Sequence, residues 1–256
     1  MRTGKFIQEA AAKSNLKNVL LELGGKSPAI VFDDCDLESA VNDTQNSVQW
    51  NSGQVCMANS RIYVQDSIAD KFIELFKTKF GAAKLGDPTK DGVNHGPQVD
   101  SIQYEKILGY IEEGKKSGKL ILGGGERDAS LGKGYFVTPT AFVDTPEDAK
   151  IMREEVFGPV VNINVFHSEK EAIEKSNNTE FGLYAAVFTK NIDRAMRVAR
   201  ALEAGSVGVN CTSPTFAMDM PFGGWKGSGI GREGIQFSLN NYLEVKTVYV
   251  KLGEAA

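Results

Sequence analysis

The fold is decided by residues 61–80, which read RIYVQDSIADKFIELFKTKF. The opening RIYVQ is rich in β-branched and aromatic residues and predicts a short strand. The apolar residues that follow recur at every fourth position, which is the spacing of one helix face: Ile68, Phe72, Phe76 and Phe80. Asp66 and Ser67 stand before them as an expected helix cap. A strand that leads directly into an amphipathic helix indicates a βαβ-type repeat.

The same alternation continues on both sides of this stretch. Further helical patterns start at Asp36, surround Tyr104 to Ile111, and run from Ile192 to Leu202 before Gly205. Further β-rich runs are residues 28–32, 160–166, 184–189 and 206–210. We therefore predict the α/β fold class, with a mainly parallel sheet flanked by helices. Ligands of such sheets usually collect beyond the carboxyl ends of the strands, so a site is expected there.

The two ends of the chain depart from this pattern. Residues 1–24 hold a helix-like piece, FIQEAAAKS, and a strand-like piece, NVLLEL. Residues 242–252, YLEVKTVYVKL, form a β-rich run with no helix after it. Such a terminal strand pairs with another chain or lies at the edge of its own sheet, and the pattern leaves both alternatives open.

Composition excludes several classes of function. The chain has 256 residues, a net charge of −4 and a pI of about 5.4, with no broad basic surface, so no nucleic acid and no membrane surface is expected as a partner. The N-terminus has no signal-peptide pattern, and no apolar run reaches the ~20 residues of a membrane helix. Three irregularly spaced cysteines favour a reducing compartment, the cytoplasm or a mitochondrial matrix. The spacing of Cys and His predicts no metal site.

Cys56 stands out because its neighbours in NSGQVCMANSR, residues 51–61, are small and polar. A nucleophilic thiol needs a base and needs donors for the oxyanion that forms after attack. His95 and His167 are the only histidines, and we expect both to be surface or strand-end residues rather than partners of Cys56.

Two acidic clusters could complete such a site. Glu22 lies in LLELGGKSP, residues 20–28, where flanking leucines would raise its pKa into the range of a general base. The alternative is a strand residue that faces solvent. In REEVFGPVV, residues 153–161, a carboxylate could hold ribose hydroxyls and the aromatic ring could pack on a ligand ring, or the segment could be a helix end and turn.

Two other clusters receive simpler interpretations. The glycines of GGWKGSGIGREG, residues 223–234, predict a tight loop and the start of a helix rather than a dinucleotide fingerprint. DDCD, residues 33–36, is interpreted as a helix N-cap.

Taken together, these motifs resemble the aldehyde dehydrogenase superfamily, most closely its NAD-dependent, broad-substrate type. LELGGKSP is similar to its glutamate signature, GQVCMANSR to its cysteine signature and EEVFGPVV to its cofactor-ribose motif. PFGGWKGSGIGREG resembles a loop near its C-terminus, and EVKTVYVKL its oligomerisation strand.

The resemblance implies catalytic roles for two residues. Cys56 would attack an aldehyde to form a thiohemiacetal, its own N–H would donate to the oxyanion, and hydride transfer to the nicotinamide would leave a thioester. Glu22 would activate the water that hydrolyses this thioester. The product would be a carboxylic acid and the cofactor NAD or NADP.

The resemblance also implies binding residues. Glu155 would bind the nicotinamide-side ribose, Phe157 would border the nicotinamide and the Leu23 carbonyl would touch its carboxamide. Gln98 would lie near the ribose, and Gly4 would be the far end of a cofactor loop. Phe216 and Phe222 would line a tunnel for small-molecule aldehydes. Asn210 would be structural, and no catalytic role is implied for Cys35 or Cys211.

Members of this family are about twice as long as this chain. Residues 1–24 would be a remnant of the cofactor-binding domain, 25–222 the catalytic domain, and 223–256 a return segment with an oligomerisation strand for a homo-oligomer, a dimer or a tetramer. We expect a fragment that could be inactive alone. Two alternatives stay open: a cofactor-independent cysteine esterase and a non-enzymatic oligomerisation fragment.

Overall fold

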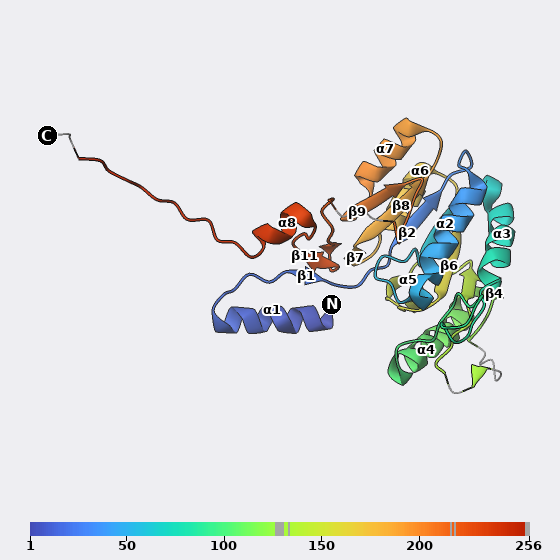
Figure 1. The fold of residues 1–256 in the computed structure, drawn as a ribbon. Helices are drawn as coiled ribbons and strands as arrows, with labels where there is room; N and C mark the ends of the chain where they lie inside the picture. The colour runs from blue at the N-terminus through green and yellow to red at the C-terminus, as the bar shows by residue number, and fades with distance from the viewer. Residues whose placement is uncertain (126–130, 133, 216, 218, 254–256) are drawn as a thin grey trace.

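The computed structural model describes the whole chain except residues 126–130, 133, 216, 218 and 254–256 (Figure 1). Its centre is a seven-stranded sheet in the order β4-β5-β6-β3-β2-β8-β9. All neighbouring strands are parallel except β4, which is antiparallel to β5. The strands are β2 (Pro28–Val31), β3 (Arg61–Gln65), β4 (Lys119–Leu122), β5 (Thr140–Val143), β6 (Val160–Phe166), β8 (Tyr184–Phe188) and β9 (Ser206–Val209). The predicted fold class is confirmed.

Helices cover both faces of this sheet. The helices α2 (Leu37–Gln49) and α3 (Ala69–Gly81) pack on one face, and α6 (Glu169–Asn177) and α7 (Ile192–Ala201) pack on the other. The remaining larger helix, α4 (Ser101–Ser117), packs with α5 (Lys150–Arg153) over β5 and β6. Because both faces are covered, β2 and β8 are buried at every position, as the uninterrupted apolar runs require.

Residues 61–80 fold into a strand and a helix, as the periodicity of their apolar residues predicts. Phe72, Phe76 and Phe80 have no exposed surface and their rings pack in series against the sheet. Asp66 differs from the prediction, because it begins a short 3-10 turn, η2 (Asp66–Ile68), and bonds the N–H of Ser67 rather than capping α3.

Two strands of the central sheet were missed by the sequence patterns. β4 and β5 pair antiparallel with an irregular register between Leu120 and Leu122, at the outer edge of the sheet. β4 is only partly buried and shows no clear alternation, and β5 is recognisable only from its pairing with β6.

A segment that follows the first helix meets a loop that follows the last strand of the central sheet. After α1 (Arg2–Ser14), the short strand β1 (Leu21–Glu22) pairs antiparallel with β11 (Gly229–Ile230). A second short pair joins β7 (Phe181–Gly182) to β10 (Trp225–Lys226). Residues 223–234 contain β10 and β11, which the predicted loop did not include, and α8 (Ile235–Asn240) begins directly after Gly234, one residue beyond the predicted segment.

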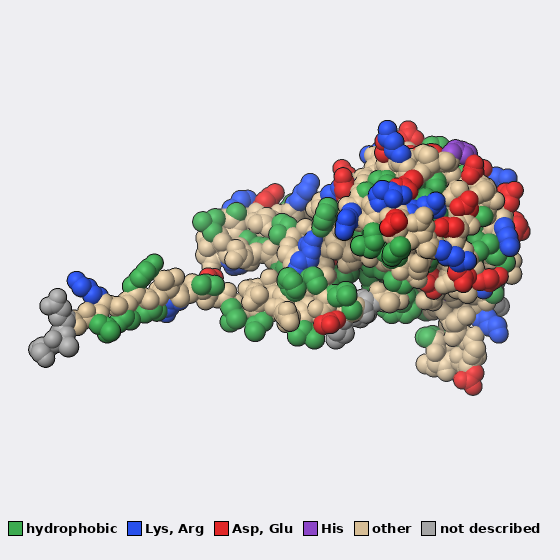
Figure 2. Space-filling view, turned by 90° about the horizontal axis from the view of Figure 1, so that it is seen from above, with side chains coloured by type: hydrophobic (Ala, Val, Ile, Leu, Met, Phe, Trp, Pro, Cys, Tyr) green, Lys and Arg blue, Asp and Glu red, His purple; other side chains and the backbone are tan. Residues whose placement is uncertain are grey.

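Residues 242–252 form no strand within the described part of the chain. The segment runs away from the body of the molecule (Figure 1) and leaves apolar side chains in solvent (Figure 2). Val245 is 98% exposed and Tyr249 is 92% exposed. The interpretation as an ordinary edge strand of the chain's own sheet is therefore wrong. Among the described residues, no helix is long and apolar enough to cross a membrane.

Candidate active site

The candidate residues gather at the amino edge of the sheet. Glu22 and Leu23 precede β2, Cys56 precedes β3, and Glu155 and Phe157 precede β6. Loops that enter neighbouring parallel strands converge at one edge, so residues far apart in the sequence meet there. The expectation of a site beyond the carboxyl ends was wrong, although it is the common arrangement for open α/β sheets.

These five residues line one pocket with a volume of about 440 Å³. The pocket walls are completed by apolar and small groups from the same loops: Gly24, Trp50, Gln54, Val55 and Met57. The glutamate, cysteine and ribose motifs are far apart in the sequence. The fold brings Glu22, Cys56 and Glu155, one residue from each motif, to the wall of the same pocket.

Glycines allow this convergence. A Cβ on Gly24 would lie 2.2 Å from Oε2 of Glu155, and a Cβ on Gly25 would lie 2.1 Å from the carbonyl oxygen of Cys56. The glycine pair of LELGGKSP is therefore needed for close approach of two other loops. The turn η1 (Trp50–Gly53), which leads to Cys56, also uses left-handed backbone at Asn51 and Ser52.

The environment of Cys56 favours the thiol over the thiolate. Burial raises the pKa of Cys56 to about 12, and the charge and hydrogen bond of Glu22 and the charge of Glu155 act in the same direction. A hydrogen bond from the Met57 backbone N–H opposes them. Because an isolated thiol with this pKa is protonated at neutral pH, attack by Cys56 needs a base.

Glu22 is placed to be that base. Burial by the surrounding protein is the largest cause of its raised pKa, the hydrogen bond with Cys56 lowers it, and the charges of Glu155 and Glu233 raise it. The side chain also keeps access to solvent. The two interpretations of Glu22, a general base and a residue that faces solvent, are therefore compatible. A carboxylate that reaches both the thiol and water can accept a proton from either one.

Glu155 lies deeper than Glu22. Its Oε1 accepts a hydrogen bond of 2.9 Å from the N–H of Gly25. Burial raises the pKa of Glu155, while the Gly25 N–H and the charges of Lys106 and Lys26 lower it. The result is a fixed carboxylate at the pocket wall with one oxygen already oriented.

Sequence reasoning missed Gln103, which holds the loop that carries Phe157. Its Nε2 donates to the carbonyls of Val156 at 3.0 Å and Phe157 at 2.8 Å, where the backbone of Phe157 takes a φ of 58°. Gln103 lies on α4 and no local pattern marks it, so only the packing of α4 on this loop reveals its role.

Lys26 was also missed, although it belongs to LELGGKSP. It is 1% exposed, and no hydrogen-bond partner for its Nζ is found within the described residues. Burial, followed by the charge of Arg61, lowers the pKa of Lys26 to about 7. The sequence did contain a signal for the burial of Lys26, because this residue stands between a glycine pair and a buried strand. A lysine side chain next to such a strand has no route to solvent.

Other predicted residues lie outside the pocket wall. Gln98 is buried and donates from Nε2 to the carbonyl of Ser52 at 3.1 Å, which supports η1. Gly4 packs in α1 against Leu23, where a Cβ would meet its side chain at 2.8 Å. Phe222 pairs its backbone with Glu233 and packs against the core. Phe216 lies outside the described residues.

The two histidines behave differently. His167 is exposed and its Nδ1 lies 3.1 Å from Asp66, as expected for a surface residue. The expectation for His95 was wrong: it is 1% exposed, and its Nε2 lies 3.1 Å from the carbonyl of Val137. Neither histidine belongs to the pocket of Cys56.

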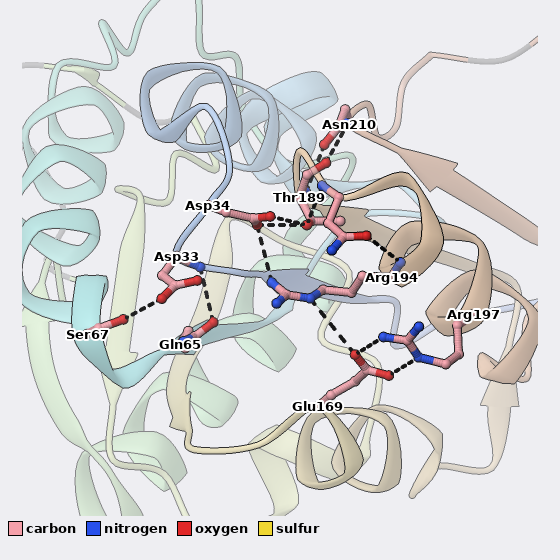
Figure 3. A network of polar contacts seen from close by, with 10 residues as sticks. Asp33, Asp34, Gln65, Ser67, Glu169, Thr189, Arg194, Arg197 and Asn210 are labelled. Atoms are coloured by element: carbon pink, nitrogen blue, oxygen red, sulfur yellow. Dashed lines mark hydrogen bonds and ion pairs between the residues drawn. The ribbon is translucent and has the colours of Figure 1, made fainter.

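The carboxyl edge of the sheet is closed by a polar network (Figure 3). Asp36 caps α2 as predicted, and Asp34 accepts from Thr189 Oγ1 at 2.7 Å and pairs with Arg194 at 3.3 Å. Asn210 bonds both backbone groups of Thr189, which supports the structural role expected for it. Within the described residues, no cluster of His, Cys, Asp and Glu could hold a metal ion.

The parallel sheet and the pocket define a class of α/β protein in which loops at the amino edge place a cysteine, two carboxylates and an aromatic ring around one space. The sequence profile of the aldehyde dehydrogenase family matches residues 1–248. The chain belongs to this family.

Individual relatives agree with this assignment. An aldehyde dehydrogenase of Agaricus bisporus is 50% identical over 249 residues, which are 97% of this chain and 49% of that protein. Gamma-glutamyl-gamma-aminobutyraldehyde dehydrogenase from Burkholderia cenocepacia J2315 superimposes with a TM-score of 0.92 at 46% identity, over 96% of this chain and 50% of that one. An indole-3-acetaldehyde dehydrogenase complexed with NAD+ superimposes with a TM-score of 0.94 at 39% identity, over 98% of this chain and 51% of that one. The chain spans about half the length of the relatives it matches.

Proposed function

We propose that this protein oxidises an aldehyde to a carboxylic acid, with NAD as the electron acceptor and Cys56 as the nucleophile. The observation that carries the proposal is the shared pocket of Cys56, Glu22 and Glu155. The catalytic and binding roles named above are part of this proposal. For Gly4, Gln98 and Phe222, the resemblance is the sole support.

In the first chemical step, Glu22 accepts the proton of the Cys56 thiol as the sulfur attacks the carbonyl carbon. The backbone N–H of Cys56 donates to the oxygen that becomes negative. The burial that raises the pKa of Cys56 also makes the thiolate poorly solvated, so a base beside the sulfur assists the attack.

The acceptor and the ring of the pocket suit a nicotinamide ribose. Glu155 offers a half-buried carboxylate that can accept from paired hydroxyls, and Phe157 offers an apolar ring beside it. Bound NAD supplies the acceptor for the hydride of the thiohemiacetal. NADP is the alternative acceptor, since Glu155 and Phe157 would hold only the nicotinamide and its ribose, which the two cofactors share.

In the last step Glu22 accepts a proton from water, which attacks the thioester carbonyl and releases the acid. The solvent access of Glu22 suits this second task. The same thiol and base could hydrolyse activated esters without any cofactor, which makes a cysteine esterase the second candidate.

Calorimetry with NAD on this chain separates these candidates when it is combined with two activity measurements. A dehydrogenase binds NAD and raises NADH absorbance when aldehyde is added, and Cys56→Ala abolishes the rise. An esterase turns over an activated acetate ester without NAD and also loses turnover in Cys56→Ala. The failure of NAD to bind, with ester turnover intact, would contradict dehydrogenase activity for the chain alone.

We further propose that residues 242–252 join copies into a homo-oligomer. The segment exposes apolar side chains on an extended backbone: Leu243, Val245, Val248, Tyr249, Val250 and Leu252. Such a segment can add as a strand to another sheet. Sedimentation should show a smaller species for a chain that ends at residue 241. An unchanged size would contradict this proposal, and it would also contradict the alternative that the chain is a non-enzymatic oligomerisation fragment.

The division into residues 1–24, 25–222 and 223–256 belongs to the same proposal. The pairs β1–β11 and β7–β10 support it, because they tie the first and last segments to each other and to the edge of the central body. Three free cysteines favour action in a reducing compartment, the cytoplasm or a mitochondrial matrix.

A further inference from the structure

Cys56 lies in a tight turn whose far side is held by buried hydroxyl groups. The N–H of Ala58 donates to the carbonyl of Val55 at 3.2 Å, so Cys56 and Met57 occupy the two central positions of the turn. Ser213 Oγ donates to the Met57 carbonyl at 2.9 Å. Ser47 Oγ accepts from the N–H of Asn59 at 3.0 Å.

The two hydroxyls are bonded to each other, which joins both contacts into one unit. Ser47 is 1% exposed and Ser213 is 2% exposed, so water does not compete for these bonds. Ser47 comes from α2, and Ser213 comes from the loop after β9. Two elements distant in the sequence therefore hold consecutive peptide groups of the turn.

The side chain of Asn59 extends the unit. Its Oδ1 accepts from Thr212 Oγ1, the neighbour of Ser213, and its Nδ2 points to the carbonyl of Pro28 at 3.4 Å. Asn59 is fully buried. The backbone that leaves Cys56 is thus tied to α2, to β2 and to the loop after β9.

This arrangement determines where the Met57 N–H points. The Met57 N–H belongs to the peptide between Cys56 and Met57, which is the central peptide of the turn. The bond from the Ala58 N–H to the Val55 carbonyl and the bond from Ser213 to the Met57 carbonyl hold the peptides on its two sides, so its orientation is restricted. The Met57 N–H then meets the sulfur of Cys56, where it is the group that favours the thiolate against burial and the charges of Glu22 and Glu155.

We propose that Ser213 and Ser47 are positioning residues for Cys56, which hold the turn so that the Met57 N–H donates to the sulfur. Neither hydroxyl lines the pocket, so neither touches substrate or cofactor. The inference rests on the proposed function only in treating Cys56 as the nucleophile.

The test is the rate at which iodoacetamide alkylates Cys56 in the full chain, followed by peptide mapping from pH 7 to 10. Below the thiol pKa this rate follows the thiolate fraction, so a raised pKa displaces the whole profile to slower rates. Since a net hydrogen bond is worth up to about a factor of ten, Ser213→Ala and Ser47→Ala should each slow alkylation by about threefold to tenfold. A loop that had merely loosened would expose the thiol and speed alkylation.

Two further variants are the controls. Thr44→Val removes a buried hydroxyl from the same helix as Ser47. Among the described residues this hydroxyl donates to the Ala40 and Val41 carbonyls, and the profile of the variant should match the parent chain. Ser213→Thr keeps the hydroxyl and should restore the parent rate. If Ser213→Ala fails to fold, Ser47→Ala gives the same comparison.

Profiles of Ser213→Ala and Ser47→Ala that overlay the parent, or that run faster, would overturn the proposal. No step of this experiment needs NAD or an aldehyde. A failure of the dehydrogenase proposal would therefore appear in calorimetry and NADH absorbance, and would leave the alkylation result to be judged by itself.

Discussion

Glu22→Gln is expected to trap an acylated form of Cys56. An amide cannot accept a proton from water, and the loss of a positioned general base slows such a step by about 10²–10⁴. Acylation by an activated acetate ester slows less at mildly alkaline pH, because bulk hydroxide can then supply the thiolate. Intact mass measured during turnover should show one acetyl group, mapped to Cys56. A fall in turnover without any trapped adduct would show that Glu22 acts before the thioester forms.

The matched control is Glu233→Gln, which removes a charge that raises the pKa of Glu22 but does not reach Cys56. It should leave deacylation nearly intact. In the parent chain, the base form of Glu22 is lost as the pH falls through its raised pKa. The acid limb of ester turnover should therefore lie above pH 4.5, the ordinary value for a glutamate.

Lys26→Met is expected to stabilise the fold near neutral pH by several kcal/mol and to remove a slope in stability. The pKa of Lys26 is about 7 in the fold and 10.5 when it is free in water. Between these values the unfolded chain binds a proton that the folded chain does not, so stability rises with pH by about 1.4 kcal/mol per unit. Methionine fills a similar volume and carries no proton, so its contribution is independent of pH.

Urea unfolding at pH 7, 8 and 9 measures this slope. Above pH 9 the raised pKa values of Cys56 and Cys35 begin to act in the opposite direction, because the folded chain then binds more protons than the unfolded one. Lys71→Met replaces an exposed lysine of α3 whose charge is not among those that act on Lys26, and it should keep the parent slope. Equal slopes for Lys26→Met and the parent chain would show that Lys26 stays protonated in the fold.

Local patterns in the sequence were sufficient for most of the fold. Strands β2, β3, β6, β8 and β9 are long apolar runs, and the helix faces follow a spacing that survives in the folded chain. The patterns failed at β4 and β5, which are no shorter than β2 and β9 and which only their pairing in the sheet identifies. They also failed for His95, whose polar neighbours in the sequence gave no sign that its ring packs inside.

The sequence by itself determined which residue types are available: a thiol, two carboxylates, an aromatic ring and the glycines between them. It also determined the alternation of strand and helix, because both depend on side chains a few positions apart. Only the tertiary structure decided that the glutamate, cysteine and ribose motifs meet, that they do so at the amino edge, and that Gln103, Ser47 and Ser213 bond the loops around them while Lys26 is buried nearby. The order in which strands pair is set by burial over the whole sheet, and no local pattern encodes it.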